Sequence, residues 1–171
     1  MNIARIETGF LEVPDKISLN LYAQGCSIQC PNCHNKHLWE FSNKRSYNLK
    51  EEEFINILKS KNDIVKWICF LGGEPLDQFH ETILFAKLSK DEKFNTCLYS
   101  GYSFDVIKEK IAENLQYFDL IISEPFIEIP VTQAHTNQKI FINTGDMFYT
   151  EINTWLDLNT FLQTDIKYKK N

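Results

Sequence analysis

The sequence predicts an α/β protein, built as an open, partial (β/α) barrel of five or six mostly parallel strands. Segments with strand periodicity are followed by segments with helix periodicity about three times. Such repeats produce parallel strands that are joined by right-handed crossovers. The chain has 171 residues, whereas a closed eight-stranded barrel typically needs about 250. The length therefore favours a barrel that stays open.

The first predicted strand covers residues 17–23, where apolar and polar side chains alternate. It leads directly into a cysteine-containing loop that begins at Gly25. Residues 1–16 carry no clear pattern, and the polar residues 40–48 are interpreted as a loop.

A helix and a buried strand are expected next. Asn48 and Glu51 have the spacing of a capping box, so a helix is predicted to begin after Asn48 and to end near residue 61. Residues 65–71 are almost continuously apolar, which is typical of a strand buried on both faces. This strand ends at Gly72-Gly73-Glu74-Pro75, and a second helix follows.

The same alternation continues toward the C-terminus. A third strand is predicted over residues 96–99, and a third helix begins near Ser103. Residues 120–122 and 139–143 have the pattern of a fourth and a fifth strand. Residues 144–171 are weakly patterned. The prediction is one domain over residues 1–171, with its core at about 17–143 and a C-terminal extension.

Composition narrows the class of protein. The net charge is −5, and no long basic stripe indicates a nucleic-acid partner. No apolar run approaches the ~20 residues that cross a bilayer, and no signal peptide is recognisable at the N-terminus. We expect a cytoplasmic protein without membrane or nucleic-acid partners. Thiols stay reduced in the cytosol, so five cysteines favour metal binding or chemistry over disulfides.

Three of the five cysteines are clustered with C-x3-C-x2-C spacing, namely Cys26, Cys30 and Cys33. Structural zinc sites take four protein ligands, and ordinary iron–sulfur clusters take four cysteines. Three thiolates therefore leave one metal position open. A Cys3His zinc knuckle with His34, His37 or His80 is the alternative. A [4Fe–4S] cluster with one iron free to bind a small molecule fits a loop after a strand better. Cys69 and Cys97 lie inside predicted strands and are interpreted as buried apolar residues.

Polar or glycine-rich segments follow the predicted parallel strands. They are the cysteine loop, 72–75, 100–102 and 123–125. Because functional groups gather at the carboxyl ends of parallel strands, these segments are expected to converge on one site. Gly72 and Gly73 would let the backbone approach a bound molecule, and Glu74 could accept a hydrogen bond from an ammonium group.

The cysteine spacing followed by Gly-Gly-Glu-Pro resembles the radical S-adenosylmethionine (SAM) superfamily. Residues 25–39, Tyr99-Ser100-Gly101-Tyr102 and Asn137-Gln138-Lys139-Ile140 are similar to the glycyl-radical-enzyme activases. They most resemble the activating proteins of anaerobic ribonucleoside-triphosphate reductase. With gaps, the resemblance runs from about residue 3 to residue 142.

The resemblance implies a radical SAM oxidoreductase with two cofactors, a [4Fe–4S] cluster and S-adenosyl-L-methionine. Reductive cleavage of SAM would give a 5′-deoxyadenosyl radical, which would generate a glycyl radical on the partner. The implied cluster ligands are Cys26, Cys30 and Cys33. The residues implied to bind the cofactors are Asn32, Cys33, His34, Gly72, Gly73, Glu74, Ser100 and Glu124. No side chain is assigned as an acid or a base.

Two positions depart from the pattern of the activases. Asn32 stands where many members of the superfamily have an aromatic residue, and Ser123-Glu124 stands where the activases usually read Asp-Gly. Glu124 is the candidate to replace that carboxylate one residue later, and the alternative is that the contact is lost.

The partners implied by the resemblance are the large glycyl radical subunit of anaerobic ribonucleotide reductase and an electron donor such as flavodoxin or ferredoxin. Three other functions remain open on sequence alone. They are an activase of a pyruvate formate-lyase type enzyme, a small-molecule enzyme resembling the deazapurine carboxylate synthases, and a zinc-binding adaptor.

Overall fold

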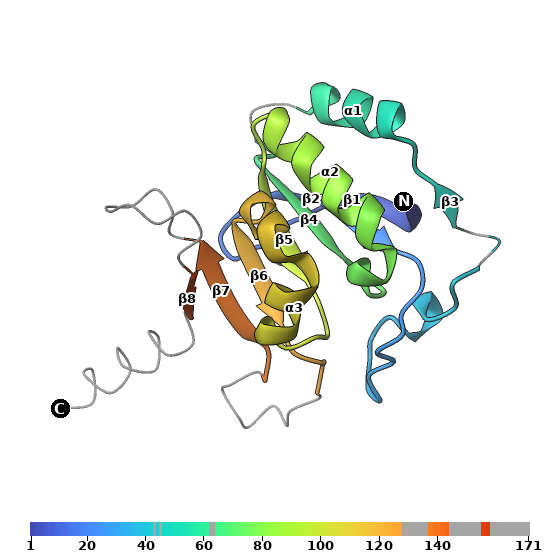
Figure 1. The fold of residues 1–171 in the computed structure, drawn as a ribbon. Helices are drawn as coiled ribbons and strands as arrows, with labels where there is room; N and C mark the ends of the chain where they lie inside the picture. Colours follow the sequence, from blue (N-terminus) through green and yellow to red (C-terminus); the bar gives the residue numbers. More distant parts are fainter. Residues whose placement is uncertain (43, 45, 62–63, 128–136, 144–154, 158–171) are drawn as a thin grey trace.

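An eight-stranded sheet forms the centre of the described structure, in the order β3-β1-β2-β4-β5-β6-β7-β8 (Figure 1). This computed structural model describes residues 1–42, 44, 46–61, 64–127, 137–143 and 155–157. The strands are β1 (Asn2–Gly9), β2 (Ser18–Ala23), β3 (Tyr47–Asn48), β4 (Trp67–Gly72), β5 (Asn95–Tyr99), β6 (Leu120–Ser123), β7 (Lys139–Asn143) and β8 (Trp155–Asp157).

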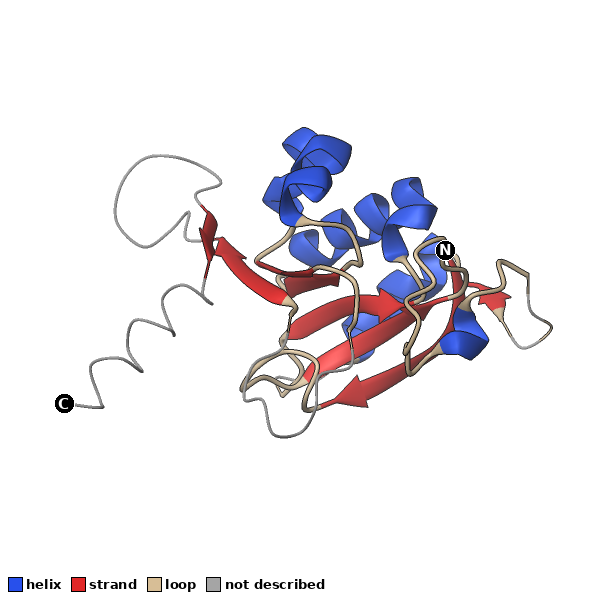
Figure 2. Cartoon of the chain, turned by 90° about the horizontal axis from the view of Figure 1, so that it is seen from below, coloured by secondary structure: helices blue, strands red, loops and turns tan. Residues whose placement is uncertain are grey.

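Three α-helices gather on one face of the sheet (Figure 2). They are α1 (Glu51–Ser60), α2 (Phe79–Asp91) and α3 (Phe104–Ile111). Three short 3-10 helices complete the described elements, namely η1 (Lys36–Leu38), η2 (Pro75–Gln78) and η3 (Ala112–Tyr117). Among the residues described, no helix has the length and apolar character needed to cross a bilayer.

The expected parallel strands form the middle of the sheet. β2 pairs with β4, β4 with β5 and β5 with β6, all in parallel. The five strands predicted from the sequence correspond in position to β2, β4, β5, β6 and β7. Both sides of the sheet are antiparallel, because β1 joins β2 and β7 joins β6 in that sense. The α/β class with a parallel centre is confirmed, and the curvature of a partial barrel stays a prediction.

The prediction of five or six strands was too low for the described residues. β1 and β3 were missed, and β8 falls in the stretch that was called weakly patterned. β1 is largely half-exposed, so its side chains do not alternate cleanly between apolar and polar. β3 has two residues and β8 has three, which is too short for a period of two to show.

The start of α1 also differs from the prediction. The residue at the N-cap position is Lys50, which makes no side-chain cap, so the proposed capping by Asn48 was wrong. Asn48 lies in β3 instead, opposite Asn2, and its Oδ1 accepts a hydrogen bond from the Met1 ammonium at 3.3 Å. Glu51 still supports the helix, because acidic residues in a first turn favour the helix dipole.

The sheet buries apolar side chains on both faces. On the helical face, Phe54 of α1 stacks on Phe85 of α2 with ring centroids 4.5 Å apart. On the other face, Cys69 and Leu71 of β4 lie beside Cys97 of β5 in a second buried cluster. Successive strand residues point to opposite faces. The alternation explains why β4 reads as a continuous apolar run, since both of its faces are covered.

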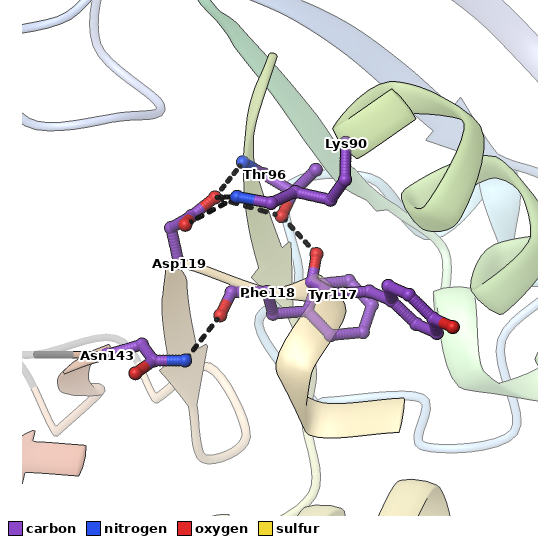
Figure 3. A network of polar contacts seen from close by, with 6 residues as sticks. All are labelled: Lys90, Thr96, Tyr117, Phe118, Asp119 and Asn143. Carbon is purple, nitrogen blue, oxygen red and sulfur yellow. Dashed lines mark hydrogen bonds and ion pairs between the residues drawn. The ribbon is translucent and has the colours of Figure 1, made fainter. Parts of the chain in front are cut away.

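A polar network ties the amino-terminal ends of the central strands to α2 (Figure 3). The Lys90 ammonium donates to both oxygens of Asp119 at 2.7 and 2.8 Å. The same carboxylate accepts from the Thr96 backbone N–H at 2.7 Å. Asn143 Nδ2 donates to the Phe118 carbonyl oxygen at 3.4 Å. This network holds the amino-terminal ends of the parallel strands, and the candidate site lies at their opposite ends.

Candidate functional site

A pocket of about 210 Å³ lies where the four parallel strands end. Each of β2, β4, β5 and β6 contributes residues that follow its last position, as the sequence predicted for the strand ends. The lining residues are Cys26, Ile28, Cys30, Cys33, His34, Asn35, Leu71, Gly72, Gly73, Glu74, Tyr99, Ser100, Gly101, Glu124, Phe126 and Gln138.

The cysteine loop is closed at its base by backbone hydrogen bonds. Gly25 N–H donates to the Leu38 carbonyl at 2.8 Å, and Cys26 N–H donates to the Trp39 carbonyl at 3.1 Å. Leu38 is buried and anchors η1 under the loop. This closure turns residues 25–39 into a compact loop that presents its cysteines to the pocket.

The three clustered cysteines share the pocket but do not surround one point. Cys26 and Cys30 are buried, and Cys33 is half-buried and accepts a hydrogen bond from Asn35 N–H at 3.3 Å. Burial raises the pKa of the Cys26 thiol. In the described part of the chain, no three His, Cys, Asp or Glu side chains meet closely enough to hold a single metal ion. As a donor set, three thiols on one loop suit an iron–sulfur cluster, whose iron atoms are each reached by a different cysteine.

Gly72 and Gly73 are required by close backbone contacts, Gly72 with the end of β2 and Gly73 with the start of the cysteine loop. A Cβ on Gly73 would lie 2.0 Å from the carbonyl oxygen of Gly25, and Gly72 has a φ of +106°. Gly73 N–H donates to the Ala23 carbonyl and Glu74 N–H to the Gly25 carbonyl, each at 2.8 Å. The glycines were predicted to let the backbone approach a bound molecule. In the structure they first allow β4 to lie against the end of β2, and they also line the pocket.

Glu74 holds a buried carboxylate in the pocket wall, with 1% of the residue exposed. Its oxygens accept from Leu76 N–H at 3.0 Å, Ser100 Oγ at 3.0 and 3.1 Å, and Gly101 N–H at 2.8 Å. Burial raises its pKa to about 7, although these hydrogen bonds favour the ionised form. Glu74 therefore joins the ends of β4 and β5 and also supplies a carboxyl group that titrates near neutral pH.

Glu124 lies at the pocket edge in a backbone conformation that glycine usually adopts. Its φ is +82°, which costs an ordinary residue about 1–2 kcal/mol. Its N–H donates to the Tyr102 carbonyl at 3.0 Å, and its Oε1 lies 3.5 Å from the Lys139 ammonium. The sequence placed Glu124 where the activases usually have glycine, and the structure retains the glycine-like backbone there.

The pocket brings together every predicted site residue except Asn32. Cys33 N–H donates to the Cys30 carbonyl at 3.0 Å, and the resulting tight turn leaves Asn32 exposed. The assigned roles of all these residues stay predictions.

Several lining residues had no role in the sequence interpretation. Asn35, Tyr99, Gly101 and Gln138 stood inside the motifs that carried the resemblance, and that position was a usable signal. Phe126 had none, although its ring lies 4.7 Å from that of His34 and joins the β6 end to the cysteine loop.

Two relatives confirm the resemblance noted in the sequence. Over 113 residues the chain is 29% identical to the "Anaerobic ribonucleoside-triphosphate reductase-activating protein" of Haemophilus influenzae, covering 63% of this chain and 73% of that protein. Over 137 residues it is 26% identical to the protein of the same name from Enterobacteria phage T4, covering 75% of this chain and 85% of the phage protein.

A solved structure shares the fold. The likeness to QueE from Escherichia coli has a TM-score of 0.51 at 15% identity. It covers 58% of this chain and 52% of QueE, so the match spans about half of that protein and shows the fold alone.

Residues 17–143 match the family described as "4Fe-4S single cluster domain". The matched range begins just before β2 and ends with β7, and it contains the cysteine loop and every strand end that lines the pocket. This chain therefore belongs to the 4Fe-4S single cluster domain family.

Proposed function

We propose that this protein activates an anaerobic ribonucleoside-triphosphate reductase by generating a glycyl radical on it, with a [4Fe–4S] cluster and SAM as cofactors. The observation that carries the proposal is the pocket at the carboxyl ends of β2, β4, β5 and β6, which is lined by Cys26, Cys30 and Cys33. The two relatives are named as activating proteins of that reductase. When bound, the cluster supplies the electron that cleaves SAM reductively to a 5′-deoxyadenosyl radical.

In this proposal the chain binds and orients its cofactors. Cys26, Cys30 and Cys33 hold the cluster as thiolates, and the missing fourth ligand leaves room for SAM. Gly72, Gly73 and Glu74 form one wall of the pocket and Ser100 continues it, because Ser100 Oγ donates to the Glu74 carboxylate. His34 and Glu124 lie on further sides of the pocket. Asn32 is exposed beside this site, and we assign it to its edge.

The partner of the proposed activase is a protein loop that carries the target glycine. One apolar side chain is exposed next to the pocket, since Ile127 is 57% exposed and directly follows the lining residue Phe126 in the chain. An electron donor such as flavodoxin or ferredoxin completes the set of partners that we propose.

Electron paramagnetic resonance of the purified proteins tests the function. The protein is reconstituted anaerobically with iron and sulfide, then mixed with the reductase, SAM and a reductant. We expect deoxyadenosine together with a glycyl radical signal on the reductase. Deoxyadenosine without that signal would contradict the activase role and favour a small-molecule reaction. Colourless protein that holds stoichiometric zinc would instead support an adaptor.

Cysteine variants give the matched controls. Cys30→Ala removes a proposed ligand and should abolish both SAM cleavage and the radical signal. Cys69→Ala removes a fully buried thiol on the pocket-side face of β4, where the expected loss is packing alone. If Cys30→Ala keeps wild-type cleavage, the cluster assignment fails.

A further inference from the structure

The carboxylate of Asp77 accepts two hydrogen bonds from Ser27, the residue that follows the first cysteine of the loop. Ser27 N–H donates to Asp77 Oδ2 at 2.6 Å, and Ser27 Oγ donates to Asp77 Oδ1 at 2.8 Å. The two residues are 50 positions apart, so these bonds join the cysteine loop to η2. We call this pair of hydrogen bonds the Ser27–Asp77 clamp.

The η2 helix that carries Asp77 is itself firmly held. At its start, the Glu74 side chain accepts from Leu76 N–H at 3.0 Å. At its end, Gln78 Nε2 donates to the Asn2 carbonyl at 2.7 Å and to the Gln24 carbonyl at 3.0 Å. Asp77 therefore lies between two residues that bind other strand ends, and it gives the loop a fixed point of attachment.

Other contacts hold the base of the cysteine loop more than its ligand-bearing part. The hydrogen bonds of Gly25 and Cys26 to residues 38 and 39 close the base, and the bond from Cys33 N–H to the Cys30 carbonyl lies inside the loop. Gln29 has a φ of +51°, a left-handed conformation that needs support from its surroundings. Within this part the clamp attaches the chain beside Cys26 directly to the sheet end.

We propose that Asp77 is a positioning residue, which holds Cys26 and the following residues in the arrangement that the cluster requires. The inference rests on the proposed function, because it assumes that Cys26 is a cluster ligand. Bonds to a charged acceptor are stronger than neutral ones, so one carboxylate can fix the loop through two of them. The same carboxylate adds negative charge near Cys26, and negative charge lowers the reduction potential of a nearby cluster.

Hydrogen exchange of the metal-free protein tests the clamp without any cluster. Asp77→Ala removes both acceptor oxygens, and exchange across residues 26–33 should become about tenfold faster. Asp77→Asn keeps one acceptor oxygen and should fall between Asp77→Ala and wild type. Asp105→Ala removes an exposed carboxylate on α3 that pairs with Lys108 at 2.8 Å, and it should leave this segment unchanged. The thermal midpoint of Asp77→Ala should stay close to that of wild type, because a loop can open while the sheet stays folded.

The reconstituted protein tests whether the clamp positions the cluster. Loss of iron to a chelator should be about tenfold faster in Asp77→Ala than in wild type or Asp105→Ala. The reduction potential of Asp77→Asn, measured by electron paramagnetic resonance, should shift upward. Ser27→Ala removes the hydroxyl and keeps the N–H, so its effect should be smaller. The double variant Ser27→Ala/Asp77→Ala should lose iron at about the rate of Asp77→Ala, since Asp77→Ala already removes both bonds of the clamp.

The outcomes separate the two proposals. Equal exchange in wild type and Asp77→Ala overturns the clamp, whether or not iron binds. Faster exchange with an unchanged chelator rate and unchanged potential overturns the positioning role. Wild-type protein that takes up no iron overturns the proposed function and the positioning role with it, while exchange still decides whether the clamp exists.

Discussion

At Glu74, burial and hydrogen bonding shift the pKa of the carboxyl group in opposite directions. Burial raises its pKa from 4.5 to about 7, and the donors Leu76 N–H, Ser100 Oγ and Gly101 N–H act in the other direction. The unfolded chain would lose this proton near pH 4.5, whereas the folded protein keeps it to about pH 7. Between these values the folded state binds more protons, so the free energy of unfolding falls as the pH rises.

A glutamine at this position should remove that pH dependence. The neutral amide keeps the size of the side chain and has no proton to lose. Relative to Glu74→Gln, wild type should lose up to about 3 kcal/mol of unfolding free energy between pH 4.5 and pH 7. Urea unfolding across this range measures the difference. Parallel pH profiles of the two proteins would contradict the raised pKa.

For individual residues, the sequence predicted which side chains belong to the candidate site better than it predicted the contacts that hold them there. The spacing of Cys26, Cys30 and Cys33 was enough to place them in one site, because a short loop leaves little choice. The reason for Gly73 was not visible, since it depends on the carbonyl of Gly25 across a strand pairing. Ser27 and Asp77 carried no signal, because their residue types are common at exposed positions and the contact spans 50 residues.

At the scale of elements, Asp119 joins three parts of the structure. Asp119 lies just before β6, and its carboxylate accepts hydrogen bonds from the Lys90 ammonium of α2 and from the Thr96 N–H of β5 (Figure 3). Asp119→Ala leaves the Thr96 N–H without this acceptor and should lower the free energy of unfolding by about 2 kcal/mol. Lys90→Met keeps that acceptor and should cost less. Urea unfolding measures both, and an equal cost for the two variants would contradict this ordering.

Element prediction succeeded where burial is two-sided or alternation is clean. β2 was found because its apolar and polar side chains alternate, and β4 was found because two-sided burial gives a continuous apolar run. β1 was not, because it is stabilised by pairing with β2 over residues that are largely half-exposed. The capping error at α1 has the same origin, since Asn48 is used by β3 through a pairing with Asn2 that is distant in sequence.

At the scale of the whole molecule, stability and the candidate site lie at opposite ends of the parallel strands. Asp119 precedes β6, whereas Asp77 follows β4. Asp119→Ala should lower the thermal midpoint by about 6 °C and leave the rate of iron loss unchanged. Asp77→Ala should speed iron loss and leave the thermal midpoint nearly unchanged. In the double variant the two effects should add, because distant sites without shared partners act independently. Calorimetry and chelator kinetics on the same samples decide this.

The parallel pairing of β4 with β2 also has a consequence for the order in which the chain folds and the cluster is inserted. The cysteine loop lies between these strands in the chain, and its carbonyl at Gly25 and its residue Ser27 bind groups that follow β4. During synthesis the ligand thiols emerge well before those groups, and long-range parallel pairing is slow. We therefore expect that the cluster is inserted into a chain that has already folded, with the newly made cysteines exposed to oxidation until β4 docks.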